Sequence, residues 1–180
     1  MNGVSHITCT EDVVLVTIRS QRGESGLIAG VFDQLAKEGI VIDMISQTVP
    51  QGSVLDISFT LYGRQMVDAL RVIGRVRDRY SQLQIMASAG NCKLQLYGQE
   101  MRDISGVAAG ALLALVDGQV DIVMITTSEV DISLVVPASG CEKALELMEK
   151  VFEHRDTAWR GIGVIPDSGL KLREMYQGFD

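Results

Sequence analysis

The chain has 180 residues, a formal net charge of −7 and a hydrophobic fraction of 47%, which is enough to bury one large core or two small ones. The acidic charge disfavours binding to nucleic acid or to an anionic membrane surface, and an aromatic fraction of 5% leaves few rings for stacking bases. No apolar run reaches the roughly 18 residues of a membrane span, and the N-terminus has no signal-peptide pattern, so we expect a cytoplasmic protein.

The first half of the chain predicts seven elements in order. A short strand over residues 4–8 comes first, and the alternating residues Val14, Val16 and Ile18 predict a second strand. After a glycine-containing loop, one apolar stripe with helical spacing consists of Leu27, Ile28, Val31, Phe32, Leu35 and Ala36. Two strands follow, of which the second alternates over residues 54–61. A further helix and a strand at residues 82–88 close this half.

The second half repeats the first. SGLIAG at residues 25–30 matches SGVAAG at residues 105–110, and Met44 matches Met124 at the same spacing. The spacing shortens by five residues at VPQGS (49–53), a segment with the Pro and Gly of a turn. Each copy therefore predicts the same order of strand, helix, strand, strand and helix.

This order predicts an α+β fold made of two ferredoxin-like βαββαβ units, with helices on one face of antiparallel sheets. The second copy lacks a good closing strand, because RDTAWRGIGVIPDSG (155–169) is a poor strand sequence. The spare N-terminal strand can supply it, so we expect the first unit to be inserted into the second. The predicted domains are residues 12–89, residues 3–9 plus 90–155, and a C-terminal tail at 156–180, in which Trp159 and Phe179 are candidates to pack on the sheet.

The motifs IDMISQ (42–47), LDISF (55–59) and ITTSEVDIS (125–133) resemble the paired ACT domains of the aspartate kinase regulatory region. The resemblance covers about residues 4–153. It implies a regulatory amino-acid-binding module, also made in some bacteria as a separate small subunit, in which lysine or threonine controls the kinase by feedback on amino-acid biosynthesis. The family's kinase domain, with its Lys-Phe-Gly-Gly start, is not found in these residues, so we expect this chain alone to transfer no phosphate.

A loop that leads from a strand into a helix is suited to bind an amino acid, because backbone N–H groups at the helix start favour a carboxylate. An acidic or amide group on the next strand would then take the ammonium. By resemblance, the effector positions of the first copy are Gly23, Glu24, Ser25, Gly26, Leu27, Ile42, Asp43, Met44 and Gln47. Those of the second copy are Met101, Asp103, Ser105, Gly106, Val107, Ala108, Ile122, Thr127, Ser128 and Glu129.

Other interpretations of these residues stay open. Gly26 and Gly106 also suit tight packing of a loop on a helix, and Asp43 also fits a solvated edge position. Met44 and Met124 suit core filling. The arginines of the second helix fit either a solvated helix end or a docking surface for an acidic partner; they are Arg71, Arg75, Arg77 and Arg79.

The cysteines and histidines predict no cofactor and no metal site. Cys9, Cys92 and Cys141 stand far apart in odd number, which argues against a disulfide framework and against structural zinc, so we expect reduced, structural thiols. His6 and His154 are too few for a histidine-based metal site. No spacing pairs a nucleophile with a base, so no catalytic residue is predicted.

Two functions follow from these patterns. The first is an effector-binding homodimer that forms by ACT pairing, acts through a population shift and has a kinase catalytic subunit as a possible partner. The second is a scaffold that has lost effector binding. The sequence departs from the family where Gly23 replaces an expected Asp, where Val41 replaces an expected Asn, and where Val130 and Asp131 replace Ile-Lys, and these departures favour the scaffold.

Overall fold

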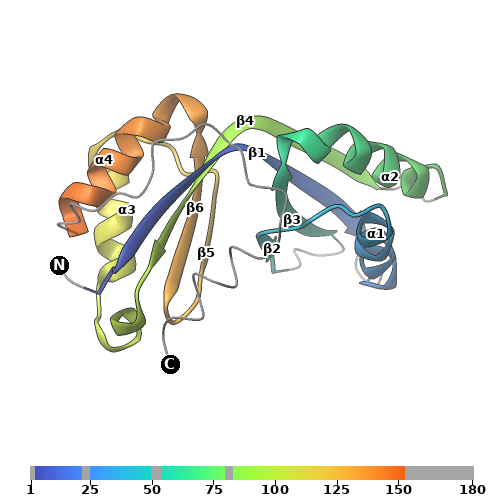
Figure 1. The fold of residues 1–180 in the computed structure, drawn as a ribbon. Helices are drawn as coiled ribbons and strands as arrows, with labels where there is room; N and C mark the ends of the chain where they lie inside the picture. The colour runs from blue at the N-terminus through green and yellow to red at the C-terminus, as the bar shows by residue number, and fades with distance from the viewer. Residues whose placement is uncertain (1–2, 22–24, 50–53, 80–82, 153–180) are drawn as a thin grey trace.

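The computed structural model describes residues 3–21, 25–49, 54–79 and 83–152. They form one six-stranded antiparallel sheet with two pairs of helices (Figure 1). The strands are β1 (His6–Gln21), β2 (Ile45–Gln47), β3 (Val54–Tyr62), β4 (Gln84–Tyr97), β5 (Met124–Thr127) and β6 (Asp131–Pro137). The helices are α1 (Ser25–Lys37), α2 (Met66–Arg79), α3 (Val107–Asp117) and α4 (Cys141–Phe152), with short 3-10 turns η1 (Gly63–Gln65), η2 (Gln99–Asp103) and η3 (Ala138–Gly140).

The two long strands, β1 and β4, run through both halves of the sheet (Figure 1). Residues 6–10 of β1 pair with residues 93–97 of β4. The following part of β1 has a neighbour on each side: residues 13–21 pair with β3, and residues 13–19 also pair with residues 84–91 of β4. The sheet order is β2-β3-β1-β4-β6-β5, so the two halves share their central pair of strands.

Each half has the ferredoxin-like order. We call residues 13–90 the first unit, in which the strands lie in the order β2-β3-β1-β4. We call residues 3–10 together with 91–152 the second unit, in which the order is β5-β6-β4-β1. The N-terminal part of β1 is thus the last strand of the second unit, which confirms the predicted fold of two ferredoxin-like units with the first inserted into the second. The exact domain boundaries at residues 12–89 and 90–155 stay a prediction.

Paired bulges at the centre of the sheet keep both pairs of helices on one face. Between Thr10 and Val13, β1 has one extra residue relative to β4, and between Ser88 and Asn91, β4 has one extra residue relative to β1. Because side chains alternate along a strand, one extra residue moves all the following side chains to the other face. For this reason the odd-numbered residues Ile7 and Cys9 point toward helices before the bulge, whereas the even-numbered residues from Val14 on do so after it.

Two separate hydrophobic cores lie between the sheet and the helices. In the first unit, the ring of Phe59 is fully buried and lies 5.1 Å from the ring of Phe32 on α1. In the second unit, α3 and α4 cover β4 and β6, and Leu134 and Met148 are fully buried. The predicted apolar stripe of α1 packs on the first core, except for Ala36, which is exposed.

A third, small cluster is formed by Met44, Met124, Val135 and Leu15. Val135 alternates with the core residues of β6, so this cluster lies on the sheet face away from the helices. Met44 and Met124 are equivalent residues of the two copies. They lie in the same cluster although β2, which follows Met44, and β5, which begins at Met124, are at opposite edges of the sheet. Both methionines therefore fill a core, as predicted, and this core is shared by the two units.

Several predicted boundaries differ from the structure. The predicted strand at residues 82–88 and the strand after residue 91 are one continuous strand, β4, because the bulge lets the chain cross from one unit to the other without a turn. The predicted N-terminal strand at residues 4–8 likewise continues into the next strand as β1. His154, Trp159, Phe179 and the tail at 156–180 lie outside the described residues. No helix in the described ranges is long and apolar enough to cross a membrane.

The pair Arg19–Asp56 joins β1 to β3 with two hydrogen bonds of 2.8 Å. The hydrogen bond from Arg19, together with its charge, lowers the pKa of the Asp56 carboxyl below its ordinary value. The pair therefore stabilises the fold above the unfolded-state pKa, and this contribution is lost as the pH falls through the lowered pKa.

We expect the Asp56→Asn protein to unfold at a lower urea concentration than the wild type at pH 7, because Asn forms no ion pair with Arg19. The difference in midpoint should shrink as the pH is lowered toward 3. Urea titrations at both values measure it, and a difference that grows on acidification would contradict the account.

Candidate functional site

At one end of the second unit, the end of β4, from which the chain continues into α3, lies beside the turn between β5 and β6. The backbone N–H of Gly98, at the end of β4, donates a 2.9 Å hydrogen bond to the carbonyl of Val130. Within the turn, the Ser128 N–H donates to the carbonyl of Asp131, and the Val130 N–H donates to the Ser128 hydroxyl. The predicted site residues in segments 101–108 and 127–129 are thereby brought to the same end of the sheet.

Gly106 forms the N-terminal boundary of α3. Its φ is +90°, a left-handed conformation that residues with a Cβ rarely adopt. No side chain caps the helix there, and the first N–H groups of a helix have no acceptor within the helix. The start of α3 is therefore able to hold an anionic group such as a carboxylate.

The structure separates the predicted second-copy residues into two groups. Met101 and Val107 are buried in the second core and can contribute to a site only through their backbone. Ala108 and Ile122 also pack against that core. The exposed members, which a ligand can reach with its polar groups, are Asp103, Ser105, Gly106, Thr127, Ser128 and Glu129.

In the first unit, the start of α1 lies at the same end of the sheet as Gln47. Both β1 and β2 are antiparallel to β3, so they are parallel to each other and their C-terminal ends share one edge. Gln47 is the last residue of β2 and is exposed, while Gly26 and Leu27 belong to the first turn of α1. Ser25 begins that helix, and Gly23 and Glu24 lie outside the described residues.

Asp43 lies away from that end. It precedes Gln47 by four residues, about 13 Å along an extended chain. Its carboxylate accepts a hydrogen bond from the ammonium of Lys93, at 2.5 Å, across the two units. Of the other predicted residues on this segment, Met44 is buried in the third cluster and Ile42 packs against the first core. In this structure Gln47, rather than Asp43, is the polar side chain nearest along the strand to the start of α1.

A groove with a volume of ≈ 380 Å³ runs between α1 and α2. Its lining residues are Gly26, Leu27, Gly30, Gln34, Glu38, Val72, Arg75 and Val76. Of these, Gly26 and Leu27 belong to the predicted effector positions. Gly30 and Gln34 on α1, and Glu38 just after it, follow Gly26 at intervals of four, as residues on one face of a helix do, and that spacing was the available signal. A second hollow of ≈ 500 Å³ lies by the N-terminal strand and includes Tyr97, Gln99 and Glu100.

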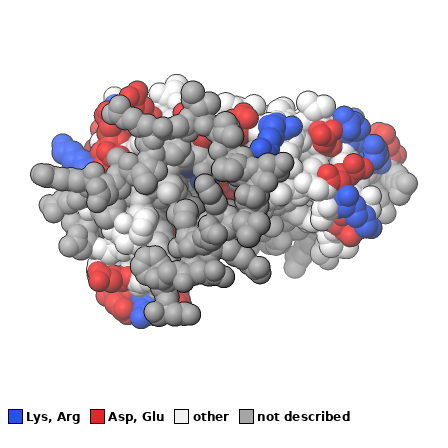
Figure 2. Space-filling view, viewed as in Figure 1, with Lys and Arg blue, Asp and Glu red and all other residues white. Residues whose placement is uncertain are grey.

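The charged residues of α1 and α2 form local pairs. Lys37 pairs with Asp33, Arg71 with Asp68, and Arg75 with Glu38. Figure 2 shows acidic and basic side chains intermixed at this end of the molecule, on the right. For Arg71 and Arg75, the pairing agrees with a solvated helix surface rather than a basic docking patch.

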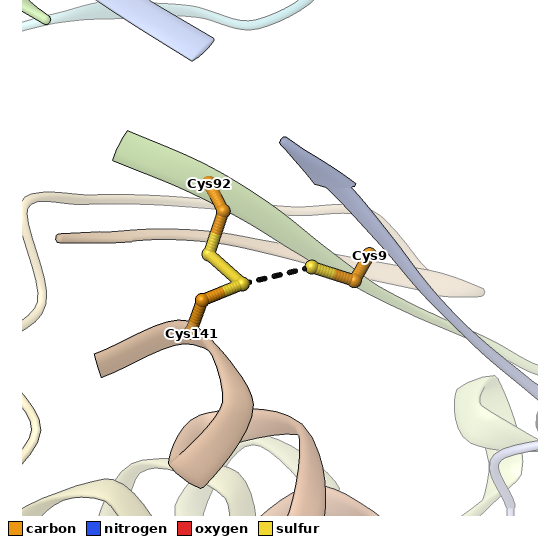
Figure 3. Close-up of a disulfide and its surroundings, with 3 residues drawn as sticks. All are labelled: Cys9, Cys92 and Cys141. Carbon is orange, nitrogen blue, oxygen red and sulfur yellow. Dashed lines mark hydrogen bonds between the residues drawn. A yellow bond between two sulfur atoms is a disulfide. The ribbon is translucent and has the colours of Figure 1, made fainter. Parts of the chain in front are cut away.

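The prediction of three separate, reduced cysteines is wrong for this structure. Cys9 on β1, Cys92 on β4 and Cys141 at the start of α4 meet in the second core (Figure 3). Cys92 and Cys141 form a disulfide, and the Cys9 sulfur lies 3.0 Å from that of Cys141. Wide separation in sequence had suggested isolation, but the pairing of β1 with β4 and the packing of α4 on both bring the residues together.

All three sulfur atoms lie within 4.8 Å of one another, a spacing that could also hold a thiophilic metal ion in the reduced state. Burial, together with a smaller contribution from the charge of Glu11, raises the pKa of the Cys9 thiol to about 11. Cys9 is therefore a protonated thiol at neutral pH.

The fold, with a loop-to-helix end in each unit, resembles a pair of ACT domains. Residues 94–152, which contain the second site, match the family model described as an ACT domain. The crystal structure of the ligand-free regulatory subunit of aspartate kinase from Thermus thermophilus is similar over 84% of this chain and 99% of that chain, with 27% identity and a TM-score of 0.76. These findings confirm the resemblance to the paired ACT domains of the aspartate kinase regulatory region.

Among whole proteins, the chain is 25% identical over 150 residues to the aspartokinase of Pseudomonas aeruginosa. This alignment includes 83% of the chain but 36% of that protein, so the chain spans about a third of the length of the curated relatives it matches. A separate match, 45% identical over 49 residues, includes 13% of the hydrogenase maturation factor HypD1 of Bradyrhizobium diazoefficiens. Because it covers so small a share of that protein, it assigns no function to this chain.

Proposed function

We propose that this chain is a regulatory module that binds a free amino acid, lysine or threonine, and thereby controls an aspartate kinase catalytic subunit by feedback. The observation that carries the proposal is the likeness to the Thermus regulatory subunit over 99% of that subunit's length. The two loop-to-helix ends, one in each unit, support it chemically. At each end the N–H groups of a helix start would take the carboxylate, and a polar side chain, Gln47 or Ser128, would orient the ammonium.

The proposal includes a homodimer. Apolar side chains are exposed on the β2 edge of the first unit, where Ile45 is 52% and Val49 is 84% exposed, and on α3 of the second unit, where Leu113 and Val116 are exposed. Unpaired sheet edges and apolar patches favour association. Side-by-side pairing of ACT units in two copies would cover these surfaces and place the effector sites at the interface.

The regulatory mechanism we propose is a shift between two arrangements of the paired units. An effector that binds one arrangement more tightly increases the population of that arrangement by its difference in affinity. The shared strands β1 and β4 and the Asp43–Lys93 ion pair connect the units, so a change at one site has a direct path to the other.

A scaffold without effector binding is the second candidate. One observation favours it: Asp43, a residue proposed to hold the effector's ammonium, is already paired with Lys93. The departures at Gly23 and Val41 point the same way. In this case the exposed apolar edges would serve protein association alone.

Replacing Gly26 by Ala separates these candidates. A Cβ at Gly26 would have no atom within 4 Å, and no positive φ is involved, so the variant should fold with unchanged or slightly higher stability. If an effector lies against this backbone, its affinity should fall at least tenfold, whereas Gln47→Ala should weaken binding by removing one hydrogen bond. Titration calorimetry with lysine and with threonine measures both effects.

Gly74→Ala is the matched control, because Gly74 is another helical glycine with open space around its Cβ position and lies on α2. It should bind as the wild type does. Wild-type affinity in both Gly26→Ala and Gln47→Ala would remove the first-unit site from the proposal.

A further inference from the structure

We propose that the three cysteines of the second unit form a site of reversible oxidation, in which Cys141 is the shared sulfur that bonds to Cys92 and can exchange its bond to Cys9. The proposal does not depend on effector binding. It rests on the positions of three sulfur atoms that come from three different elements, β1, β4 and α4 (Figure 3).

The geometry identifies Cys141 as the shared partner. Its Cα lies 6.2 Å from that of Cys92, within the range that a disulfide spans, and its sulfur also touches that of Cys9 at 3.0 Å. Cys9 and Cys92 lie on neighbouring strands, but the residue opposite Cys9 is Leu94. Cys92 is thus a diagonal neighbour of Cys9, at a Cα separation of roughly 7–8 Å, which is too long for a direct disulfide without backbone movement.

The chemistry balances in two steps. In the first, the thiols of Cys92 and Cys141 reduce one low-molecular-weight disulfide, such as oxidised glutathione, to two thiols, and the Cys92–Cys141 bond forms. In the second, the Cys9 thiolate attacks the Cys141 sulfur. A Cys9–Cys141 bond forms, the Cys92–Cys141 bond breaks, and Cys92 leaves as a thiolate that takes up the proton lost by Cys9. The second step is isomerisation and needs no oxidant.

Burial determines which of the three sulfur atoms a small thiol or disulfide can reach. Cys9 and Cys92 are 4% and 1% exposed, whereas Cys141 is partly buried at the surface of the same core. A small thiol or disulfide therefore meets Cys141 first. The structure has the Cys92–Cys141 bond and a free Cys9 thiol, and a protonated thiol exchanges with that bond only slowly.

The bond ties the start of α4 to the central strand β4. Helix α4 packs against α3, and α3 begins at the candidate effector site of the second unit. Oxidation at this site would fix the helix layer behind that effector site. The disulfide closes a loop with a sequence separation of 49, and a loop of this length removes considerable entropy from the unfolded chain.

The test compares the wild-type 180-residue chain with Cys9→Ser, Cys92→Ser and Cys141→Ser in buffers of defined reduced-to-oxidised glutathione ratio. Free thiols are alkylated, and disulfide-linked peptides are mapped by mass spectrometry. We expect the Cys92–Cys141 linkage in the wild type and in Cys9→Ser, a Cys9–Cys141 linkage in Cys92→Ser, and no internal linkage in Cys141→Ser. Full reduction should lower Tm by on the order of 10 °C in the wild type and in Cys9→Ser, and by nothing in Cys141→Ser.

Circular dichroism establishes that each variant is folded, and Cys→Ala versions replace any serine variant that is not. Three results would overturn the proposal. One is the absence of an internal linkage at every glutathione ratio. Another is a Cys9–Cys92 linkage in Cys141→Ser. The third is one zinc or copper ion per chain in the isolated protein, with all three thiols shielded from alkylation until a chelator is added, since that would make the cluster a metal site.

Discussion

A chain that lacks residues 3–10 is expected to lose the folded second unit while the first unit keeps its sheet. These residues supply the last strand of the second unit, and they bury Val4, Ile7 and Cys9 in its core. At roughly 1.5–3 kcal/mol for each large buried side chain, Val4 and Ile7 alone contribute about 3–6 kcal/mol, a large part of the net stability of a typical domain. The deletion also leaves residues 93–97 of β4 as an open sheet edge.

Hydrogen exchange followed by mass spectrometry measures this outcome segment by segment. We expect β5, β6, α3 and α4 to exchange fully in the shortened chain, while β3 and α2 stay protected. A synthetic peptide of residues 1–11, added in trans, is the control and should restore protection to the second unit. Full protection of the second unit without the peptide would show that the N-terminal strand is not part of it.

The second large effect is expected at the ion pair between Asp43 and Lys93. The Lys93 side chain is 10% exposed and that of Asp43 is 37% exposed, so the pair is only partly screened by solvent. Asp43→Asn leaves a nearly buried ammonium without its counter-ion and should cost roughly 1–3 kcal/mol, less than a fully buried pair would. Combining it with Lys93→Met should recover most of this loss, because the remaining unpaired charge is removed.

Urea unfolding of the two single variants and the double variant gives the coupling energy of the pair. The matched control is the cycle for Arg19 and Asp56, a more exposed pair in the same sheet, for which we expect a smaller coupling. Equal couplings in the two cycles would mean that the Asp43–Lys93 pair is solvated like an ordinary surface pair. That result would leave Asp43 available to a ligand.

Much of the fold could be predicted because the two copies carry the same periodic signal. The matching segments SGLIAG (25–30) and SGVAAG (105–110) mark the starts of helices at equivalent places, and the poor closing strand of the second copy pointed to the N-terminal strand. The paired bulges could not be predicted. An extra residue near Asp12 changes which face Val14 points to, and no local pattern distinguishes that from a strand end.

The sequence predicted which two segments form the candidate site, but it did not predict how their side chains are arranged. Both segments of the second copy do meet at one end of the sheet, because a strand-to-helix loop and the turn of a neighbouring hairpin must share that end. Spacing could not reveal that Lys93 on β4 reaches Asp43, since that contact depends on how the shared sheet curves. The cysteine cluster was also not predictable from spacing. Cys9 and Cys141 are 132 residues apart and meet only through strand pairing and helix packing.

The most direct test of the central claim, that this chain binds a regulatory amino acid, is a thermal-unfolding panel of the twenty amino acids with the oligomeric state recorded in parallel. A ligand at 100 times its Kd adds about 2.7 kcal/mol to the stability of the folded state, which raises Tm by roughly 5–10 °C for a chain of this size. We predict such a rise with lysine or threonine and none with most of the others. No rise with any amino acid, from a protein that still forms its dimer, would contradict effector binding and leave the scaffold as the function.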